Sequence, residues 1–370
     1  MPPLDRRELL LRLGGSAALL ALPPGLAEAA ASIAGPGLFA AARKDDKGTF
    51  SAALFSLDGG DVRAVELPER GHDIALRPGT PEWVAFARRP GRFGVAVPAG
   101  NRPPIWFASK PDRHFFGHGV FSADGKLLYA TENDYARARG VIGVRDASAG
   151  YAQIGEFPAH GMEPHDIALL PDGRTMVIAN GGIRTHPDQG AAELNLGDMQ
   201  PSLVYVDVET GDLLEEQVLP PTLHQLSIRH LAVAARDLVV FGCQYRGPDA
   251  DAPALIGFHR RGETPTLVPA PGATQTALKN YIGSVAADAG GTIVAASAPK
   301  GGLITYWDVG TRSFLGTCAL NDGCGVAPTR HRASFLLTSG EGWLATGDSA
   351  GELERQASSF AWDNHAILVA

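Results

Sequence analysis

The chain has 370 residues, of which 45% are hydrophobic and 19% are charged, so it is long and apolar enough to bury a large core. Its formal net charge of -8 argues against nucleic acid as a general partner. The 45 glycines and 27 prolines are typical of many short strands joined by turns, and they exclude a mainly helical fold.

The first 30 residues predict an export signal. Arg6-Arg7 precede an apolar run from Ala17 to Leu26, and Ala27-Glu28-Ala29 offers a small-x-small cleavage site. The run is short and contains Pro23-Pro24, so it is a poor membrane anchor, and no later stretch is long and apolar enough to span a bilayer. We therefore expect residues 1–30 to be a twin-arginine-type signal, a periplasmic location, and no stable membrane span.

Short strands follow the signal through to the end of the chain. Three strand-like segments come first, at residues 37–42, 49–57 and 62–67, and one more ends the chain at 364–369. Between them an apolar strand opens repeatedly in the same sequence setting, at intervals of roughly 40 to 65 residues, close to the length of a four-stranded propeller blade. The sequence therefore predicts an all-β fold over residues 37–370, a seven-bladed β-propeller in which N-terminal and C-terminal strands share one blade and leave no open sheet edge.

The residue that starts each repeated strand is histidine in five of the seven repeats. In chain order the column reads His72, His118, His165, His230, Ile282, Cys324, His365. Because the first strand of each propeller blade lines the central channel, we expect the five imidazoles to form a ring on the axis. Neutral imidazole is a common ligand of transition metals, so the ring predicts a metal site, with copper or iron as the candidate ion. Histidines that only hydrogen-bond the backbone of a neighbouring blade are the alternative.

The sulfur-containing residues bear on the choice of metal. Met162, Met199 and Cys324 fall near the same rim and would favour copper if they took part. A short turn-rich spacer separates Cys318 from Cys324, so the two could instead form a disulfide. A disulfide would exclude Cys324 from a metal site.

Two long polar loops are expected on the face that carries the histidine ring, at residues 131–140 and 180–187. Long loops on rigid scaffolds often carry binding sites. The rim residues that we expect to frame or cap the ring are Arg137, Arg184, His186, Glu132, Asp134 and Glu163. Further arginines on this face, among them Arg88, Arg89 and Arg246, predict a second kind of ligand, a small anion held by bidentate contacts. An ordinary solvated rim is the alternative.

These loops, together with residues 164–168, 194–196 and 199–203, resemble an exported bacterial family classed as a domain of unknown function, DUF1513. The stretch Gly181-Gly182-Ile183-Arg184-Thr185-His186 is the most specific part of a resemblance that covers nearly all of the mature chain. Members are often encoded beside imelysin-like iron-regulated proteins and a dihaem oxidoreductase-like protein. The resemblance therefore implies iron or other metal handling at the cell envelope, with neighbouring periplasmic iron-uptake proteins as partners, and it implies no catalytic residues.

The sequence contains no Gly-x-Ser-x-Gly elbow, no phosphate-binding glycine loop before a helix and no His-Glu-x-x-His. We therefore favour a periplasmic binding protein with a histidine-lined axial site. One alternative is an enzyme of the propeller lactonase or quinoprotein type, which would need an acidic metal site or a cofactor on the axis. Another is a protein-interaction scaffold.

Overall fold

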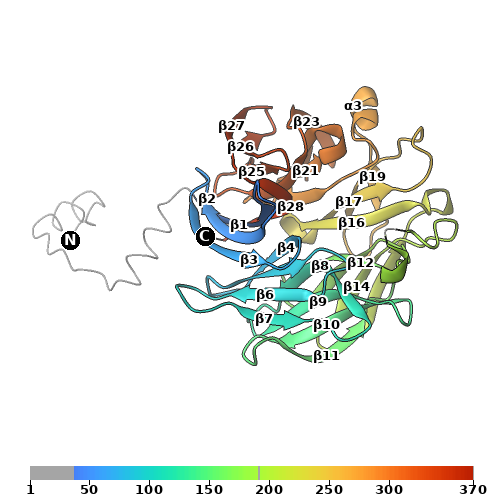
Figure 1. The fold of residues 1–370 in the computed structure, drawn as a ribbon. Coiled ribbons are helices and arrows are strands. Elements are labelled where there is room, and N and C mark those ends of the chain that lie inside the picture. Colours follow the sequence, from blue (N-terminus) through green and yellow to red (C-terminus); the bar gives the residue numbers. More distant parts are fainter. Residues whose placement is uncertain (1–36, 191, 370) are drawn as a thin grey trace, which may run out of the picture. The chain divides into compact units, whose positions relative to one another are not determined.

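A computed structural model describes residues 37–190 and 192–369, which form seven four-stranded sheets. Within each sheet the neighbouring strands pair in antiparallel fashion, and in Figure 1 the sheets follow one another around a common centre. The chain is therefore an all-β, seven-bladed β-propeller, as the repeats predict. The predicted signal, residues 1–30, lies outside the described residues.

Each blade has an innermost, a second, a third and an outermost strand. The innermost strands are β4 (Gly71–Leu76), β8 (Arg113–Phe121), β12 (Pro164–Leu169), β16 (Leu226–Val233), β20 (Ser284–Ala287), β24 (Gly323–Pro328) and β28 (Ala361–Leu368). The second strands are β5 (Trp83–Ala87), β9 (Leu127–Asp134), β13 (Thr175–Asn180), β17 (Val239–Tyr245), β21 (Ile293–Ala298), β25 (Ser334–Ser339) and β1 (Leu38–Lys44).

The outer half of each blade follows in the same order. The third strands are β6 (Phe93–Val97), β10 (Arg139–Asp146), β14 (Ser202–Asp207), β18 (Ile256–His259), β22 (Leu303–Asp308), β26 (Trp343–Asp348) and β2 (Phe50–Ser56). The outermost strands are β7 (Ile105–Ala108), β11 (Ala152–Pro158), β15 (Leu213–Val218), β19 (Thr266–Val268), β23 (Ser313–Ala319), β27 (Leu353–Ala357) and β3 (Asp61–Leu67).

Helical structure in the described residues is limited to short connecting turns. They are α3 (Gly272–Ala277) and the 3-10 helices η1 (Pro187–Gln189), η2 (Pro221–Leu223), η3 (Ala235–Asp237) and η4 (Pro299–Gly301). Across residues 37–190 and 192–369, no helix has the length and apolar character needed to cross a membrane.

The two ends of the described chain close the propeller. The last strand, β28, pairs antiparallel with β1, so that Ala366 lies opposite Ala41. β28 also contacts the innermost strands on both sides, β24 and β4, which completes the ring of inner strands. Phe55 and Trp362 pack with their ring centroids 4.5 Å apart and bury the junction. The predicted closure is confirmed, and it removes the edge strands that an open stack would expose.

The innermost strands are irregular where the column residues stand. Breaks in the strand pairing of β4, β8, β12 and β28 leave His72, His118, His165 and His365 outside the regular register, and in β16 the break falls directly before His230. A β-bulge bends the strand and re-aims the side chain of the extra residue. The bulges therefore free four of the five imidazoles from the alternation of the strand, and in β16 the freed residue is Arg229.

Candidate metal centre and its surroundings

The structure brings the five histidines of the column together in one buried cluster, which we call the histidine ring (His72, His118, His165, His230 and His365). Successive ring centroids lie 4.9, 5.1, 5.0, 4.9 and 4.7 Å apart, in the order 72 to 118, 118 to 165, 165 to 230, 230 to 365 and 365 to 72. Five separate blades therefore deliver one imidazole each to a common point on the axis.

Several nitrogens of this ring are buried without a hydrogen-bond partner among the described residues. They are Nε2 of His118, Nε2 of His365 and both ring nitrogens of His230. His72, His118 and His365 offer nitrogens that all lie within 4.8 Å of one another, and His118, His165 and His230 do the same. Buried polar groups are normally hydrogen-bonded, so the unpartnered nitrogens, together with the close approach of these imidazoles, fit a shared cation.

Carboxylates hold two members of the ring from behind. His118 Nδ1 lies 3.2 Å from Asp73 Oδ2 and 3.3 Å from Asp166 Oδ1. His72 Nδ1 lies 3.2 Å from an oxygen of Asp363. An imidazole that donates its Nδ1 proton to a carboxylate keeps the lone pair of Nε2 free for a metal. Carboxylates therefore orient two of the five histidines.

The ring nitrogens differ in their affinity for protons. Burial disfavours the charged form of His118, but Asp166 and Asp73 outweigh it and raise its pKa to about 10. Burial, reinforced by the charge of His118, lowers the pKa of His365 to about 4. Burial also lowers the pKa of His72 well below its usual value, although Asp363 opposes this shift. The carboxylates beside His118 therefore favour a positive charge there, which a metal ion on Nε2 would supply in place of a proton. Burial also lowers the pKa of His165 and His230, so the other four imidazoles favour the neutral form.

His165 differs from the other ring members in what it contacts. Its Nδ1 lies 3.0 Å from Nη1 of Arg229, and a guanidinium can only donate, so this nitrogen accepts and Nε2 carries the proton. A protonated Nε2 cannot ligate a metal, and the charge of Arg229 repels one. The nitrogens of His72, His118 and His365 are therefore the better ligand group, with His230 beside them.

The two gaps of the column supply no ligand. Ile282 is fully buried in the core. Cys324 Sγ lies 3.3 Å from the carbonyl oxygen of Asp363, and burial raises the pKa of this thiol to about 12, so it is protonated and turned toward the backbone.

The predicted disulfide between Cys318 and Cys324 is wrong, since both are free thiols. Cys318 lies on the outermost strand β23 with Sγ 3.4 Å from Tyr306 Oη, whereas Cys324 lies on the innermost strand β24 of the next blade. The short spacer between the two cysteines is the crossing from the outside of one blade to the axis. It therefore separates the two thiols.

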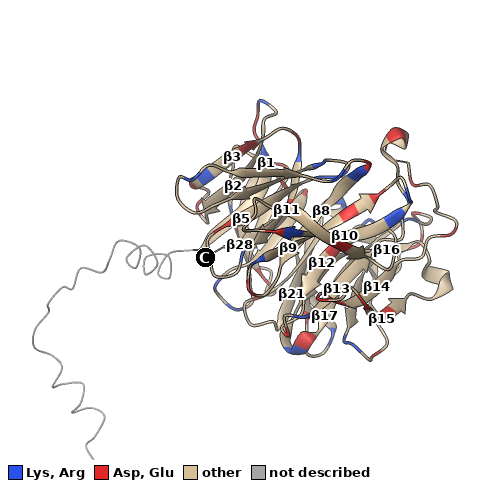
Figure 2. Ribbon diagram, turned by 90° about the horizontal axis from the view of Figure 1, so that it is seen from below, with Lys and Arg blue, Asp and Glu red and all other residues tan. Residues whose placement is uncertain are grey.

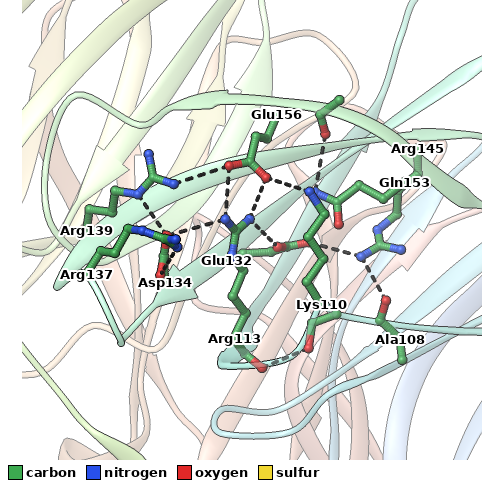
Figure 3. Close-up of polar contacts among 12 residues, drawn as sticks. Ala108, Lys110, Arg113, Glu132, Asp134, Arg137, Arg139, Arg145, Gln153 and Glu156 are labelled. Atoms are coloured by element: carbon green, nitrogen blue, oxygen red, sulfur yellow. Dashed lines mark hydrogen bonds and ion pairs between the residues drawn. The ribbon is translucent and has the colours of Figure 1, made fainter.

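The structure also corrects the predicted position of Glu132, Asp134 and Arg137. Strand β9 continues to Asp134, so both acids lie inside a blade and not in a loop above the ring. Figure 3 shows Glu132 between Arg113 and Arg145, with its Oε1 3.0 Å from Arg145 Nη2. Arg137 Nη1 lies 3.2 Å from Asp134 Oδ2 at the edge of the same network. These residues form an ion-pair network, which we call the blade network.

The remaining predicted rim residues occupy three different places. Glu163 is buried and accepts from Arg229 Nη1 at 2.6 Å, and also from Arg89. His186 lines a cavity of about 310 Å³ together with His114 and Arg89. Arg184 is exposed, and its backbone N–H donates to Asn195. Glu163 thus binds the arginines next to the histidine ring, and His186 lines a neighbouring cavity.

A second cavity, of about 300 Å³, lies over the histidine ring and is lined by three of its members, His72, His165 and His230. Four arginines line it as well, and we call it the arginine cavity after Arg88, Arg89, Arg229 and Arg246. Figure 2 shows basic positions interspersed with acidic ones over the propeller. The concentration of guanidinium groups is therefore a property of this cavity.

Two functional contacts were not predicted from the sequence, those of Asp363 and Arg229. Asp363 stands two residues before His365, whereas Asp73 and Asp166 directly follow their histidines, so a search for His-Asp pairs passes it over. Arg229 directly precedes His230, and its position beside a column histidine was the available signal.

Gly117 is required for close packing at the ring. Its φ is +105°, and a Cβ there would lie 2.7 Å from His72 Cδ2. We expect Gly117→Ala to lower the free energy of unfolding by about 2 to 3 kcal/mol, because left-handed strain and a steric clash add up. The matched control is Gly100→Ala, where φ is +66° and no atom of the described residues lies within 4 Å of an added Cβ, so the strain of about 1 kcal/mol applies without a clash. Equal losses in urea denaturation would contradict the clash.

His114 gives the protein a pH dependence that is separate from the ring. Its Nδ1 contacts the carbonyl of Phe115 at 2.8 Å and its Nε2 contacts Asn133 Nδ2 at 3.0 Å, which satisfies the neutral imidazole. Burial, more than any other cause, lowers its pKa from 6.5 to about 4. Between these values the unfolded chain binds the extra proton, so stability falls as pH falls, by about 1.4 kcal/mol per pH unit for this group.

We therefore expect His114→Phe to flatten the decline of stability from pH 6.5 to pH 4 by that amount, measured by urea denaturation at several pH values. The exposed His331 provides the control, since His331→Phe should leave the slope unchanged. A wild-type slope in His114→Phe would show that His114 is not neutral in the native state.

Comparisons with known proteins agree with the geometry and leave the chemistry open. A family model described as protein of unknown function, DUF1513, matches residues 65–369. No curated protein matches the chain. Hydrazine synthase of Kuenenia stuttgartiensis is structurally similar, with a TM-score of 0.61 and 12% identity over 93% of this chain and 99% of that one. At this identity the similarity concerns the fold alone.

Proposed function

The chain belongs to the DUF1513 family, described as proteins of unknown function, and we propose that it is a metal-binding protein whose histidine ring holds a copper or iron ion. His72, His118 and His365 are the proposed ligands, and His230 is the neighbouring imidazole. The observation that carries the proposal is the set of buried, unpartnered ring nitrogens on His118, His230 and His365. Without a bound ion, each of these buried nitrogens would destabilise the fold, because it makes no hydrogen bond in place of the one it makes to water in the unfolded chain.

The charges around the ring support a cation at this position. Asp73, Asp166 and Asp363 contact His118 and His72, so three carboxylates surround two of the proposed ligands. Imidazole nitrogens suit copper, iron and zinc, and among divalent first-row ions Cu²⁺ generally binds most tightly. The buried thiol of Cys324 faces the backbone, so the donor set is one of imidazoles.

The proposal extends to where the protein works. The twin-arginine pattern in residues 1–30 supports export to the periplasm, and the resemblance stated above supports a role in iron or other metal handling at the cell envelope. Neighbouring iron-uptake proteins are the proposed partners. A twin-arginine route would let the protein fold around its metal before export.

The test is the metal content of the full chain, produced with its own N-terminal segment and purified without chelators. We expect close to one copper or iron ion per chain by elemental analysis, and we expect Cu²⁺ to restore this occupancy after dialysis against a chelator. Substoichiometric metal in both preparations would refute the proposal. A stoichiometric metal that survives in a His72→Ala, His365→Ala double variant would refute the ligand assignment.

A further inference from the structure

The arginine cavity contains a buried guanidinium that is only partly used. Arg229 is 1% exposed, and its Nη1 contacts Glu163 at 2.6 Å and His165 at 3.0 Å. Its Nε and Nη2 have no hydrogen-bond partner among the described residues. A buried charged donor normally has all of its hydrogens satisfied, so the two unused donors of Arg229, a residue that lines the cavity, indicate a missing acceptor.

Positive charge exceeds negative charge around this cavity. The carboxylate of Asp363 faces Arg70 and Arg88, at 4.0 Å in the case of Arg88, and the carboxylate of Glu163 is shared by Arg89 and Arg229. Glu193 lies 3.3 Å from Arg246. Four guanidinium groups but one carboxylate, that of Glu193, thus line the cavity, and the carboxylates of Asp363 and Glu163 face these arginines from outside its lining. A further anion would stabilise the cavity, because the like charges of its guanidinium groups repel one another in a partly desolvated space.

The arginines also perturb one another. Burial, followed by the charges of Arg70 and Arg89, lowers the pKa of Arg88 against the opposing effect of Asp363. Burial lowers the pKa of Arg229 to about 10, and the charges of Arg89 and Arg246 act in the same direction. Both shifts have the sign expected for guanidinium groups that are buried beside other guanidinium groups.

We propose that the arginine cavity binds a small oxyanion, either a free inorganic anion or the carboxylate of a small organic acid. Guanidinium groups bind both kinds through paired N–H···O bonds, and a volume of about 300 Å³ suits a ligand of a few to a dozen heavy atoms. Gln244, Tyr281 and Asn364 line the same cavity and add neutral hydrogen-bonding groups.

The position of the cavity connects it to the histidine ring. His72, His165 and His230 form part of its wall, so a bound anion lies next to the proposed metal centre. The oxyanion would then serve as a ligand of the metal, or the metal would bind as its complex with the oxyanion. This connection rests on the proposed function, whereas the anion site itself depends only on the arginines.

The test measures anion binding to the full chain by isothermal titration calorimetry, in metal-free and metal-loaded protein, with inorganic phosphate and citrate as the two probes. We expect saturable binding of at least one probe to the metal-free protein with a Kd below about 1 mM. Arg88→Gln and Arg246→Gln should each weaken it by about 10-fold or more, since each removes charged hydrogen bonds. Arg137→Gln is the matched control, because Arg137 is 68% exposed and pairs with Asp134 outside the cavity.

Each outcome decides one of the two proposals. Binding of phosphate alone assigns an inorganic oxyanion, binding of citrate alone assigns a carboxylate, and either result supports the site. No binding to the metal-free protein, or equal binding by wild type and the two cavity variants, overturns it whatever the metal content. Anion binding by a protein that contains no metal after purification and takes none up would leave the arginine site standing and refute the metal centre.

Discussion

Replacing His118 with alanine should weaken Cu²⁺ binding by more than about 100-fold. The loss of a residue that only orients a ligand typically lowers metal affinity 10- to 100-fold. His118 is itself a proposed ligand, so its loss should lower the affinity further. Its Nε2 is buried and unpartnered, while Asp73 and Asp166 hold its Nδ1. Affinity is measured by competition with a chromophoric chelator, and folding is checked by circular dichroism.

Two further variants separate a metal site from a merely structural cluster. His365→Ala should lose affinity to a similar degree, because this residue belongs to the same group of close nitrogens. His165→Gln should retain most of the affinity, because Nδ1 of His165 accepts from Arg229 and a glutamine oxygen can replace it. The exposed His331 is the control for the loss of an imidazole. Equal losses in His165→Gln and His365→Ala would contradict the assignment of the ligands.

Replacing Glu132 with alanine should lower the free energy of unfolding by about 3 to 5 kcal/mol, without a direct effect on the metal site. Glu132 is fully buried and contacts Arg145, which is itself 2% exposed. Its other partner is Arg113, whose Nη1 lies 3.5 Å from Oε2. Without Glu132, the acceptors that Arg145 keeps among the described residues are the carbonyls of Ala108 and Tyr151, and these leave a buried guanidinium without a described counter-ion.

The magnitude is checked by urea denaturation, with a matched acid from the same network as the control. Glu156 contacts Arg113 and Lys110 but is 24% exposed, so Glu156→Ala should cost about 1 kcal/mol. A double variant, Glu132→Leu with Arg145→Met, should recover most of the loss, since replacing both charges by apolar groups removes the unpaired one. A double variant as unstable as Glu132→Ala would show that packing and not charge makes Glu132 necessary.

The closure of the propeller was predictable because it follows from local patterns. The strand-like segments at residues 37–67 and 364–369 lacked partners in their own neighbourhood, and β28 pairs with β1 as expected. The histidine column was predictable for the same reason, because a repeated position in a repeated blade must recur around the axis.

The positions of the acids were not predictable. Residues 131–140 read as a long polar loop, but strand β9 runs to Asp134 and buries Glu132, because the arginines of the blade network neutralise both carboxylates. Arg137 and Arg139, which pair with Asp134, lie within residues 131–140. The partners of Glu132 lie outside this segment, Arg113 on β8 and Arg145 on β10, so no pattern within residues 131–140 predicts that Glu132 is buried.

The sequence by itself determined the number of blades, their closure and the presence of five histidines at equivalent positions, because each of these depends on a period along the chain. Only the tertiary structure decided which imidazoles can act as ligands. That depends on side-chain partners from other blades, such as Asp363 behind His72 and Arg229 beside His165, which lie 291 and 64 residues away from them in the chain. A repeat places equivalent residues on one circle, but the bulges and the buried charges around each one give them different chemistry.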